Sequence, residues 1–259
     1  MNWAFKGCSH NSRVLDCAPR TRLVYRPTML RFLALLLLLP ACAPVDDDDD
    51  SSATSPEPIS AELRALDAFG GTVDADVTVV TGAFDDDTAA TDSAGEVTVT
   101  LTADAPFRVR FEASGYAPHE LVGVATDDFA FTTLMGSRAA EAQVYGLLGL
   151  TADPSKGTLV VDLHEDDGTS PATGGSVSID ADHDAPFIFM NSGPQSGSTL
   201  LPGANTFVTF PNVTAGEVTI TPDHPDADCL LGPAREAEFN ERTWDVPADT
   251  VVVVDFICA

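Results

Sequence analysis

The sequence predicts an all-β fold, with two small antiparallel β-sandwich domains joined by a short helix. Three observations predict it. Apolar and polar residues alternate with a period of two in several short segments, Gly, Asp and Pro clusters separate these segments, and one segment alone has a helical composition. Many short strands divided by turns favour sandwiches over an α/β fold.

The clearest strands place an apolar residue at every second position, and we expect these residues to face a core. They are Val97, Val99 and Leu101, then Phe107, Val109 and Phe111, then Leu159, Val161 and Leu163. Turn-forming clusters flank them at TDSAG (91–95), ASGY (113–116), DDGTSPATGG (166–175) and PNVTAG (211–216). The exception is SRAAEAQVYGLLGL (137–150), in which helix formers follow Ser137, a candidate N-cap.

The N-terminal part has the pattern of an export signal. FLALLLLL (32–39) follows Arg31 and precedes Pro40, Ala41 and Cys42. A run of about 7 to 15 apolar residues is typical of a secretory signal, whereas a transmembrane helix needs about 20. Because residues 1–28 contain no such run, Met29 is a candidate for the true start.

LPAC (39–42) resembles the lipobox of bacterial lipoproteins, in which the cysteine receives a lipid and becomes the first residue of the mature chain. The resemblance implies lipidation of Cys42, although Pro40 departs from the usual residue at that place. The alternative is an ordinary cleaved signal in which Cys42 has no role.

The expected domain organisation follows from these segments. Residues 1–41 are the signal region, and 42–65 are the lipidated cysteine with an acidic, Ser- and Pro-rich tether, which we expect to be disordered. The first sandwich is expected at 66–136, a helical linker at 137–155 and the second sandwich at 156–259.

Charge excludes one class of partner. The chain has 13 Lys and Arg against 40 Asp and Glu, a formal net charge of −27. After Cys42 the basic residues are scattered singly, apart from Arg108 and Arg110, so nucleic acid is excluded as a partner. The expected partners are the membrane, through the lipid anchor, and an envelope protein or glycan. We expect an exported protein, lipid-anchored in the outer membrane of a Gram-negative bacterium.

Two cysteines remain after Cys42, and an even pair in an exported chain predicts a disulfide between Cys229 and Cys258. In the C-terminal run 251–258, alternate residues beginning at Val252 and ending at Cys258 share one face. The other face carries Asp255, so we expect the Val252 face to meet the core. Free thiols or metal ligands are the alternative, but no CxxC motif supports them.

The segment TDSAGEVTVTLTADAPFRVRFEASGYAPHEL (91–121) resembles the carboxypeptidase regulatory-like domain, a small transthyretin-like sandwich. Gly95, Gly115 and Tyr116 match its T-D-x-x-G turn and G-Y pair. A weaker second copy covers 158–179 and 206–221, without the G-Y pair. The resemblance implies a module without zinc ligands. The similar strings AGEVTVT (94–100) and AGEVTIT (215–221) lie in different strands of the two copies, so they are not equivalent segments.

The sequence contains no local catalytic motif, so we expect no catalytic residue, metal or cofactor. SGPQSGS (192–198) does not have the spacing of a nucleophile elbow. His119, His164, His183 and His224 show no paired spacing, and an exposed turn histidine is the better interpretation of each.

Acidic turns leave calcium binding as an alternative. DADHD (180–184) begins like an EF-hand loop, but Ala185 replaces the glycine of the sharp turn and Asn191 replaces the bidentate glutamate. The sequence therefore predicts a non-enzymatic cell-envelope lipoprotein with two carboxypeptidase regulatory-like modules. The alternative is a calcium-dependent or carbohydrate-binding adhesion module.

Overall fold

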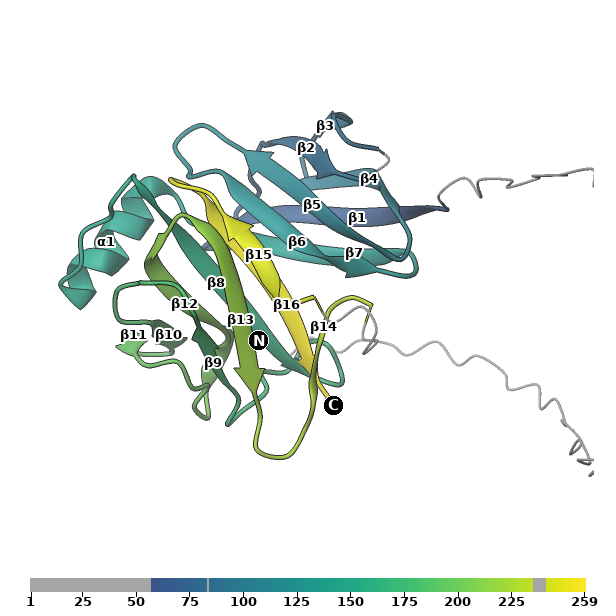
Figure 1. Cartoon of the computed structure of the whole chain (residues 1–259). Coiled ribbons are helices and arrows are strands. Elements are labelled where there is room, and N and C mark those ends of the chain that lie inside the picture. The colour runs from purple at the N-terminus through teal and green to yellow at the C-terminus, as the bar shows by residue number, and fades with distance from the viewer. Residues whose placement is uncertain (1–56, 83, 235–240) are drawn as a thin grey trace, which may run out of the picture. The chain divides into compact units, whose positions relative to one another are not determined.

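The computed structural model describes residues 57–82, 84–234 and 241–259, all within one compact unit, Ala53–Ala259. These residues form strands and one helix (Figure 1), so the predicted all-β class is confirmed. The strands before the helix are β1 (Pro58–Asp67), β2 (Asp76–Thr81), β3 (Thr88–Ala90), β4 (Glu96–Thr102), β5 (Ala105–Glu112), β6 (His119–Ala125) and β7 (Phe129–Met135).

After the helix α1 (Arg138–Leu148), the chain forms the second set of strands. They are β8 (Lys156–Glu165), β9 (Ser176–Ile179), β10 (Phe187–Met190), β11 (Gly193–Ser196), β12 (Ala204–Thr214), β13 (Gly216–Asp223), β14 (Cys229–Leu231), β15 (Thr243–Val246) and β16 (Val251–Cys258).

A long sheet runs through both halves of the molecule. Its strand order is β11-β10-β12-β8-β16-β6-β5-β2-β3, with β14 also pairing with β16. A three-stranded sheet β4-β1-β7 belongs to the first half, and another, β15-β13-β9, belongs to the second. The two halves are therefore joined by strand pairing between β16 and β6 as well as by the helix (Figure 1).

The central strands β6 and β16 supply side chains to two separate cores. In β6, Leu121 belongs to the first core and its neighbour Val122 to the second. In β16, Val253 belongs to the first core and Val254 to the second. Successive side chains of a strand point to opposite faces of its sheet, so the two cores lie on opposite faces of these shared strands.

This arrangement corrects the expectation of a single core face in β16. The face from Val252 to Cys258 is buried in the second core, as predicted. The other face is buried too, with Val251 and Val253 in the first core. A strand covered on both faces is expected to be apolar on both, which accounts for four consecutive valines from Val251 to Val254.

The strands identified from alternation occupy the predicted cores. The apolar residues of β4 and β5 lie in the first core and those of β8 in the second: Val97, Val99, Leu101, Phe107, Val109 and Phe111, and then Leu159, Val161 and Leu163. Most strand pairs are antiparallel, as expected, but β1 with β7 and β16 with both β6 and β8 are parallel. β16 is the last strand in the sequence and lies between β6 and β8, which are both far from it along the chain. No hairpin therefore fixes its direction relative to these two strands.

The helix begins where the sequence predicts. The Ser137 Oγ accepts a hydrogen bond from the Ala140 backbone N–H (3.2 Å), the geometry of an N-cap. The helix ends at Gly149, whose φ of 72° is left-handed and suits glycine. Tyr145 is its one buried residue, and its ring packs edge-on against Phe187 of β10.

The T-D-x-x-G turn has a clear physical basis. The buried Thr91 Oγ1 accepts from the Ala75 N–H and donates to the Val73 carbonyl, both at 2.9 Å. Asp92 Oδ1 accepts from the backbone N–H of Ala94 (2.8 Å) two residues along the chain. Gly95 adopts a φ of 75°, and a Cβ there would lie 2.6 Å from the Ala65 carbonyl oxygen. Only glycine fits this turn.

Candidate functional site

The lipidation site predicted at Cys42 lies outside the residues that the structure describes. Within the described ranges, no helix has the length and apolar character needed to cross a membrane.

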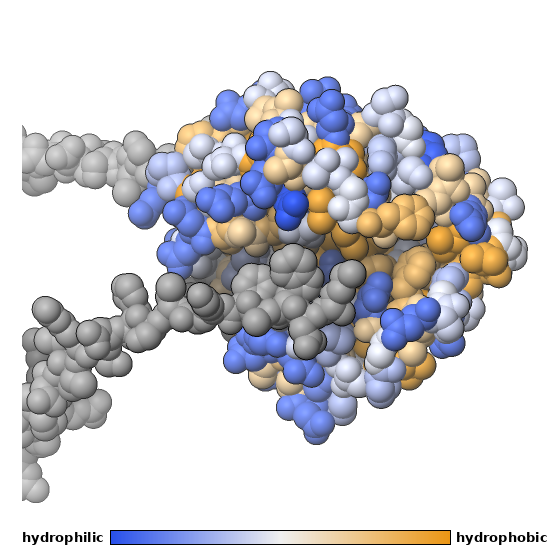
Figure 2. All heavy atoms as spheres, turned by 180° about the vertical axis from the view of Figure 1, so that it is seen from behind, coloured by the Kyte–Doolittle hydropathy of each residue, from blue (hydrophilic) through white to orange (hydrophobic). Residues whose placement is uncertain are grey.

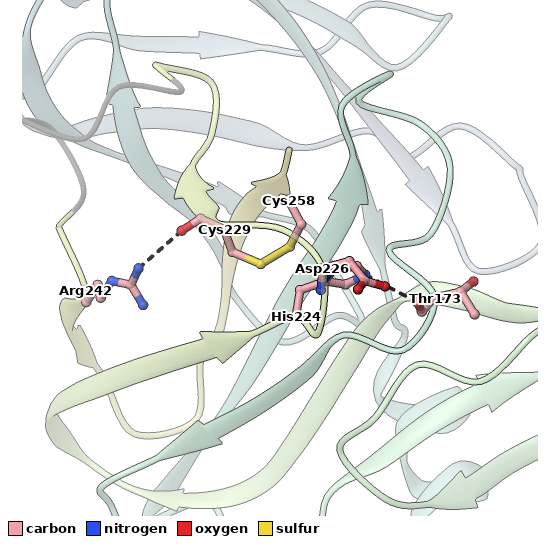
Figure 3. The surroundings of a disulfide bond; sticks show 6 residues. All are labelled: Thr173, His224, Asp226, Cys229, Arg242 and Cys258. Atoms are coloured by element: carbon pink, nitrogen blue, oxygen red, sulfur yellow. Dashed lines mark hydrogen bonds between the residues drawn. A yellow bond between two sulfur atoms is a disulfide. The ribbon is translucent and has the colours of Figure 1, made fainter.

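The predicted disulfide is present. Cys229 of β14 and Cys258 of β16 are direct cross-strand partners joined by a sulfur–sulfur bond (Figure 3). The Arg242 Nη2 donates to the Cys229 carbonyl (3.2 Å) beside it. Both cysteines are buried in the second core, so the bond fastens the short strand β14 to the shared strand β16.

Two histidines contradict the expectation of exposed turn residues. His119 lies in β6 and is only 2% exposed. Its Nδ1–H donates to the Ala117 carbonyl (2.9 Å), and burial lowers its pKa to about 4. His164 lies in β8, partly buried, beside Asp255. The expectation failed because both lie in strands that a second layer covers, which spacing between histidines does not reveal.

The other two histidines lie in loops and are partly exposed. His183 packs edge-on against Phe210, with 5.0 Å between ring centroids. In Figure 3, His224 lies near the disulfide, where its Nε2–H donates to the Thr173 carbonyl (3.3 Å) and its Nδ1 accepts from the Asp226 N–H (3.2 Å). Both contacts of His224 are with backbone atoms, which is typical of a structural loop residue.

The acidic turns considered for calcium use their carboxylates within the protein. Asp180 accepts from the Thr219 N–H (2.7 Å), and Asp184 Oδ2 accepts from the Asn212 side chain (2.7 Å). Asp167 accepts from the Ser170 hydroxyl and from the backbone N–H groups of Ser170 and Thr169, and these hydrogen bonds hold its pKa well below the ordinary range. Among the described residues, no three His, Cys, Asp or Glu side chains gather in a way that could hold a metal ion.

A cluster of three charged residues, the Arg–Glu–Arg cluster, covers the second-core face of β5 and β6. The buried carboxylate of Glu120 pairs with Arg108 and with Arg110, whose Nε donates at 2.8 Å. Arg108 also donates from Nη2 to the Asp245 carbonyl of β15 (2.8 Å). Opposite charges at this spacing neutralise one another, and Arg108 connects strands of the two halves.

The first-core face of the same sheet has a cavity of about 130 Å³ beyond the edge of β7. Its lining includes apolar side chains: Phe107, Leu121, Val122, Phe129, Ala130, Phe131 and Ile257. His164, Asp255 and the loop residues Gly168, Gly232 and Pro233 complete the lining. The cavity is therefore mixed, with slightly more polar than apolar surface exposed to it.

Two ionisable residues, His164 and Asp255, line this cavity, and with the neighbouring Asp162 they form a second cluster, the Asp–His–Asp cluster. The His164 Nε2 lies 3.4 Å from Asp255 Oδ1, and Asp255 is the direct cross-strand partner of Asp162. Burial raises the pKa of Asp162, whose Oδ1 accepts from the Thr206 hydroxyl (2.8 Å). A cavity that combines apolar side chains with a few polar groups has the general character of a binding site.

Sequence reasoning missed both clusters because neither has a local signature. Arg108 and Glu120 are 12 positions apart, and Asp162 and Asp255 are 93 apart. The signal that could have found the second cluster is the polar residue within the apolar run of β16: Asp255 interrupts a strand that is otherwise buried on both faces. A carboxylate at such a position needs a partner.

Two other hollows lie elsewhere on the described residues. One of about 220 Å³ is lined by Arg138 and Asp249, which form a bidentate ion pair with both contacts at 2.7 Å. A broader one, of about 570 Å³, lies across exposed side chains of β1, β4 and β7. Figure 2 shows hydrophobic patches among hydrophilic ones on one face of the molecule. The exposed large hydrophobic residues are Phe69, Val80, Leu134, Leu147 and Leu201.

No family model matches the chain, and no curated protein matches it. Among solved structures, the chain is 11% identical to the Bacillus anthracis TIE protein, with 77% of this chain and 34% of that one covered and a TM-score of 0.25. The Streptococcal ancillary pilin is 14% identical, with 78% and 63% covered and a TM-score of 0.24. GBS52, the minor pilin of Streptococcus agalactiae, is 9% identical, with 77% and 95% covered and a TM-score of 0.24. Similarity at these TM-scores carries no conclusion about the fold or function of this chain.

Proposed function

We propose that this protein is a non-enzymatic lipoprotein of the cell envelope, attached through a lipid on Cys42. The observation that carries the proposal is FLALLLLLPAC (32–42), an apolar run of signal length that ends at a cysteine after small residues. The acidic residues that follow, 46–50, have the composition of a tether. We expect the anchor to lie in the outer membrane of a Gram-negative bacterium, with the strands held away from the lipid.

The anchored part presents two sandwich modules similar to carboxypeptidase regulatory-like domains. The T-D-x-x-G turn supports this, because Thr91, Asp92 and Gly95 each have a structural role in it. In the second half, Asn212 supports the turn cluster PNVTAG (211–216), which contains the pattern N-V-x-x-G. Its side chain accepts from the Asp153 N–H and donates to the Thr151 carbonyl, both at 2.9 Å. The modules serve a structural or binding role at the envelope.

The absence of catalysis is part of the proposal. Catalysis at neutral pH needs an activated nucleophile, a positioned acid and base, or an open metal site. The described residues place no Ser, Thr or Cys nucleophile against His164, and His119 is enclosed in the first core. A screen of the purified protein against peptidase, esterase and glycosidase substrates is expected to give no turnover above buffer. Turnover abolished by His164→Gln would contradict it.

Metabolic labelling with a fatty acid tests the anchor. The wild-type chain is expected to incorporate label and to fractionate with membranes, whereas Cys42→Ser incorporates none and leaves the membrane fraction. Two acyl chains bury many methylene groups at about 0.8 kcal/mol each, which is enough for stable attachment. Cys17→Ser, a matched cysteine change upstream of the apolar run, is the control and should label normally. Label that survives Cys42→Ser would overturn the proposal.

A further inference from the structure

The turn between β1 and β2 holds one aromatic ring out in the solvent. Phe69 is 91% exposed, the largest exposed fraction among the large hydrophobic side chains of the described ranges. Asp67 Oδ1 accepts from the backbone N–H groups of Phe69 (2.8 Å) and Gly71 (2.9 Å), and the Asp67 N–H donates to the Gly71 carbonyl (2.7 Å). Gly70 supplies the left-handed φ of 83° that the turn needs. The ring is therefore presented by a turn that its own hydrogen bonds close.

Phe69 belongs to an uncharged, apolar tip. Residues 68–72 read AFGGT and carry no charge. Leu134 of β7 is 51% exposed, and it is the direct strand partner of Leu66, which leads into the turn. Apolar side chains exposed together at one place mark a contact surface. We call Leu66, Phe69 and Leu134 the apolar tip.

The opposite end of the first half is acidic. The turns β2–β3, β4–β5 and β6–β7 lie there, beside the first residues of β1, where Asp128 Oδ1 accepts from the Ser60 N–H (2.7 Å). In their described residues these turns contain no Lys or Arg and six exposed aspartates: Asp85, Asp86, Asp87, Asp104, Asp127 and Asp128. The turns at the end that carries the tip have two exposed aspartates, Asp74 and Asp92. An anionic membrane surface therefore repels the acidic end more strongly than the tip.

The chain before β1 is long enough to bring the tip to a bilayer. β1 has 10 residues, so Phe69 lies about 33 Å along the strand from Pro58. The 15 residues between Cys42 and Pro58 can span up to about 50 Å. A short tether to a lipid keeps the tip at an effective concentration in the millimolar range, so that weak insertion is enough to hold it there.

The chemistry of the tip fits lipid better than a protein pocket. Protein interfaces surround an apolar anchor with polar groups that fix the orientation of the partner. The side chains of residues 68–71 offer no such group. Aromatic and leucine side chains that protrude from a surface enter the boundary between headgroups and acyl chains without polar partners.

We propose that the β1–β2 turn inserts Phe69 into the bilayer interface near the lipid anchor. The strands themselves stay outside the lipid, and the acidic end of the first half faces away from the membrane. The choice of lipid as the partner rests on the proposed anchor at Cys42.

The test attaches the full chain to vesicles without relying on lipidation in the cell. Cys8→Ser and Cys17→Ser leave Cys42 as the one thiol outside the disulfide. This thiol is coupled to a maleimide lipid in phosphatidylcholine vesicles. A failed labelling experiment on Cys42 therefore leaves this test valid, and a failed insertion test leaves the labelling result unchanged.

A tryptophan at the tip reports contact with the acyl chains. Phe69→Trp is compared with Val80→Trp, since Val80 is an exposed apolar residue of β2 at the acidic end of the same half. Both variants carry Trp3→Phe and share the buried Trp244 as background. With brominated acyl chains, emission from Phe69→Trp is expected to fall at least about twofold and to shift to the blue, whereas Val80→Trp is unchanged.

Three results would overturn the proposal. Quenching in neither variant would show that the tip stays in water, and equal quenching in both would show that the membrane does not select the tip. A blue shift of Phe69→Trp without vesicles, increasing with protein concentration, would show that the tip contacts a second copy of the chain. Because Phe69 is almost fully exposed, its replacement is expected to leave the fold intact in each case.

Discussion

The two faces of the shared sheet carry ionisable clusters of opposite design. On the second-core face, Glu120 is held between Arg108 and Arg110, and Arg108 also bonds to the Asp245 carbonyl. On the first-core face, Asp255 lies beside His164 and Asp162, and both Asp255 and His164 line a cavity. The first cluster is an arginine-paired carboxylate, whereas the second lies at a cavity.

The two clusters are expected to affect the stability of the fold differently. Removing one member of a buried, paired cluster leaves the others uncompensated, so the Arg–Glu–Arg cluster is expected to stabilise the junction of the two halves. The Asp–His–Asp cluster keeps Asp162 in an environment that disfavours its charged form. The two clusters are therefore expected to change stability in opposite directions.

One of the two largest effects is expected at Glu120. Glu120→Gln removes the charge that holds two arginines, and we expect a loss of about 3 kcal/mol in the free energy of unfolding. Urea denaturation followed by circular dichroism measures it. Glu112→Gln is the control, since Glu112 is an exposed partner of Arg110, and it should cost less than about 1 kcal/mol. Equal losses for the two variants would show that the cluster has no special role.

The disulfide is expected to stabilise the second half by a similar amount. Cys229 and Cys258 are separated by 29 positions, and the chain-entropy model gives about 3–4 kcal/mol for a loop of this size. The double variant Cys229→Ser with Cys258→Ser should show this loss in urea denaturation. Intact mass after alkylation without reductant should show neither thiol modified in the wild type. Two modified thiols there would refute the bond.

A pH effect follows from His119 in the first core. Burial lowers its pKa to about 4, against an unfolded value of about 6.5. The folded state therefore binds fewer protons than the unfolded state. The stability that the neutral His119 contributes is complete above about pH 6.5 and is lost as the pH falls toward about 4. The loss is on the order of 3 kcal/mol. His119→Gln should flatten this part of the stability–pH curve, and an unchanged curve would contradict the burial of a neutral imidazole.

The smallest change in the free energy of unfolding is expected for Asp162→Asn, and its direction is opposite to that of Glu120→Gln. Its raised pKa means that the aspartate penalises folding as the pH rises above its unfolded value of about 4. Asp162→Asn keeps a partner for Thr206 while removing the charge, so stability at pH 7 should be unchanged or higher by about 1 kcal/mol. Thermal melting measures it. A loss as large as that of Glu120→Gln would make the two clusters equivalent.

Local features of the fold were predictable and long-range ones were not. The alternation at Val97–Leu101 and the cap at Ser137 depend on neighbouring residues, so the sequence predicts them directly. The pairing of β16 with β6 joins segments about 130 positions apart in parallel, and no hairpin or motif encodes it. The Asp–His–Asp cluster likewise depends on the long-range pairing of β16 with β8, and His119 lies directly opposite Val251 of β16. The sequence indicates the central position of β16 only through the four consecutive valines that begin at Val251.

We expect the shared strands β6 and β16 to make the two halves one cooperative unit. In a chain carrying Trp3→Phe, Trp244 is the only tryptophan, and it reports on the second core. Val77→Ala removes two methyl groups from the first core, in β2, and should lower the unfolding free energy by about 2 kcal/mol. Glu62→Gln, exposed in β1, is the control and should change it by less than about 0.5 kcal/mol. We predict that Val77→Ala shifts the Trp244 fluorescence transition and the circular dichroism transition together, whereas a fluorescence midpoint that stays at its wild-type value would contradict a shared sheet.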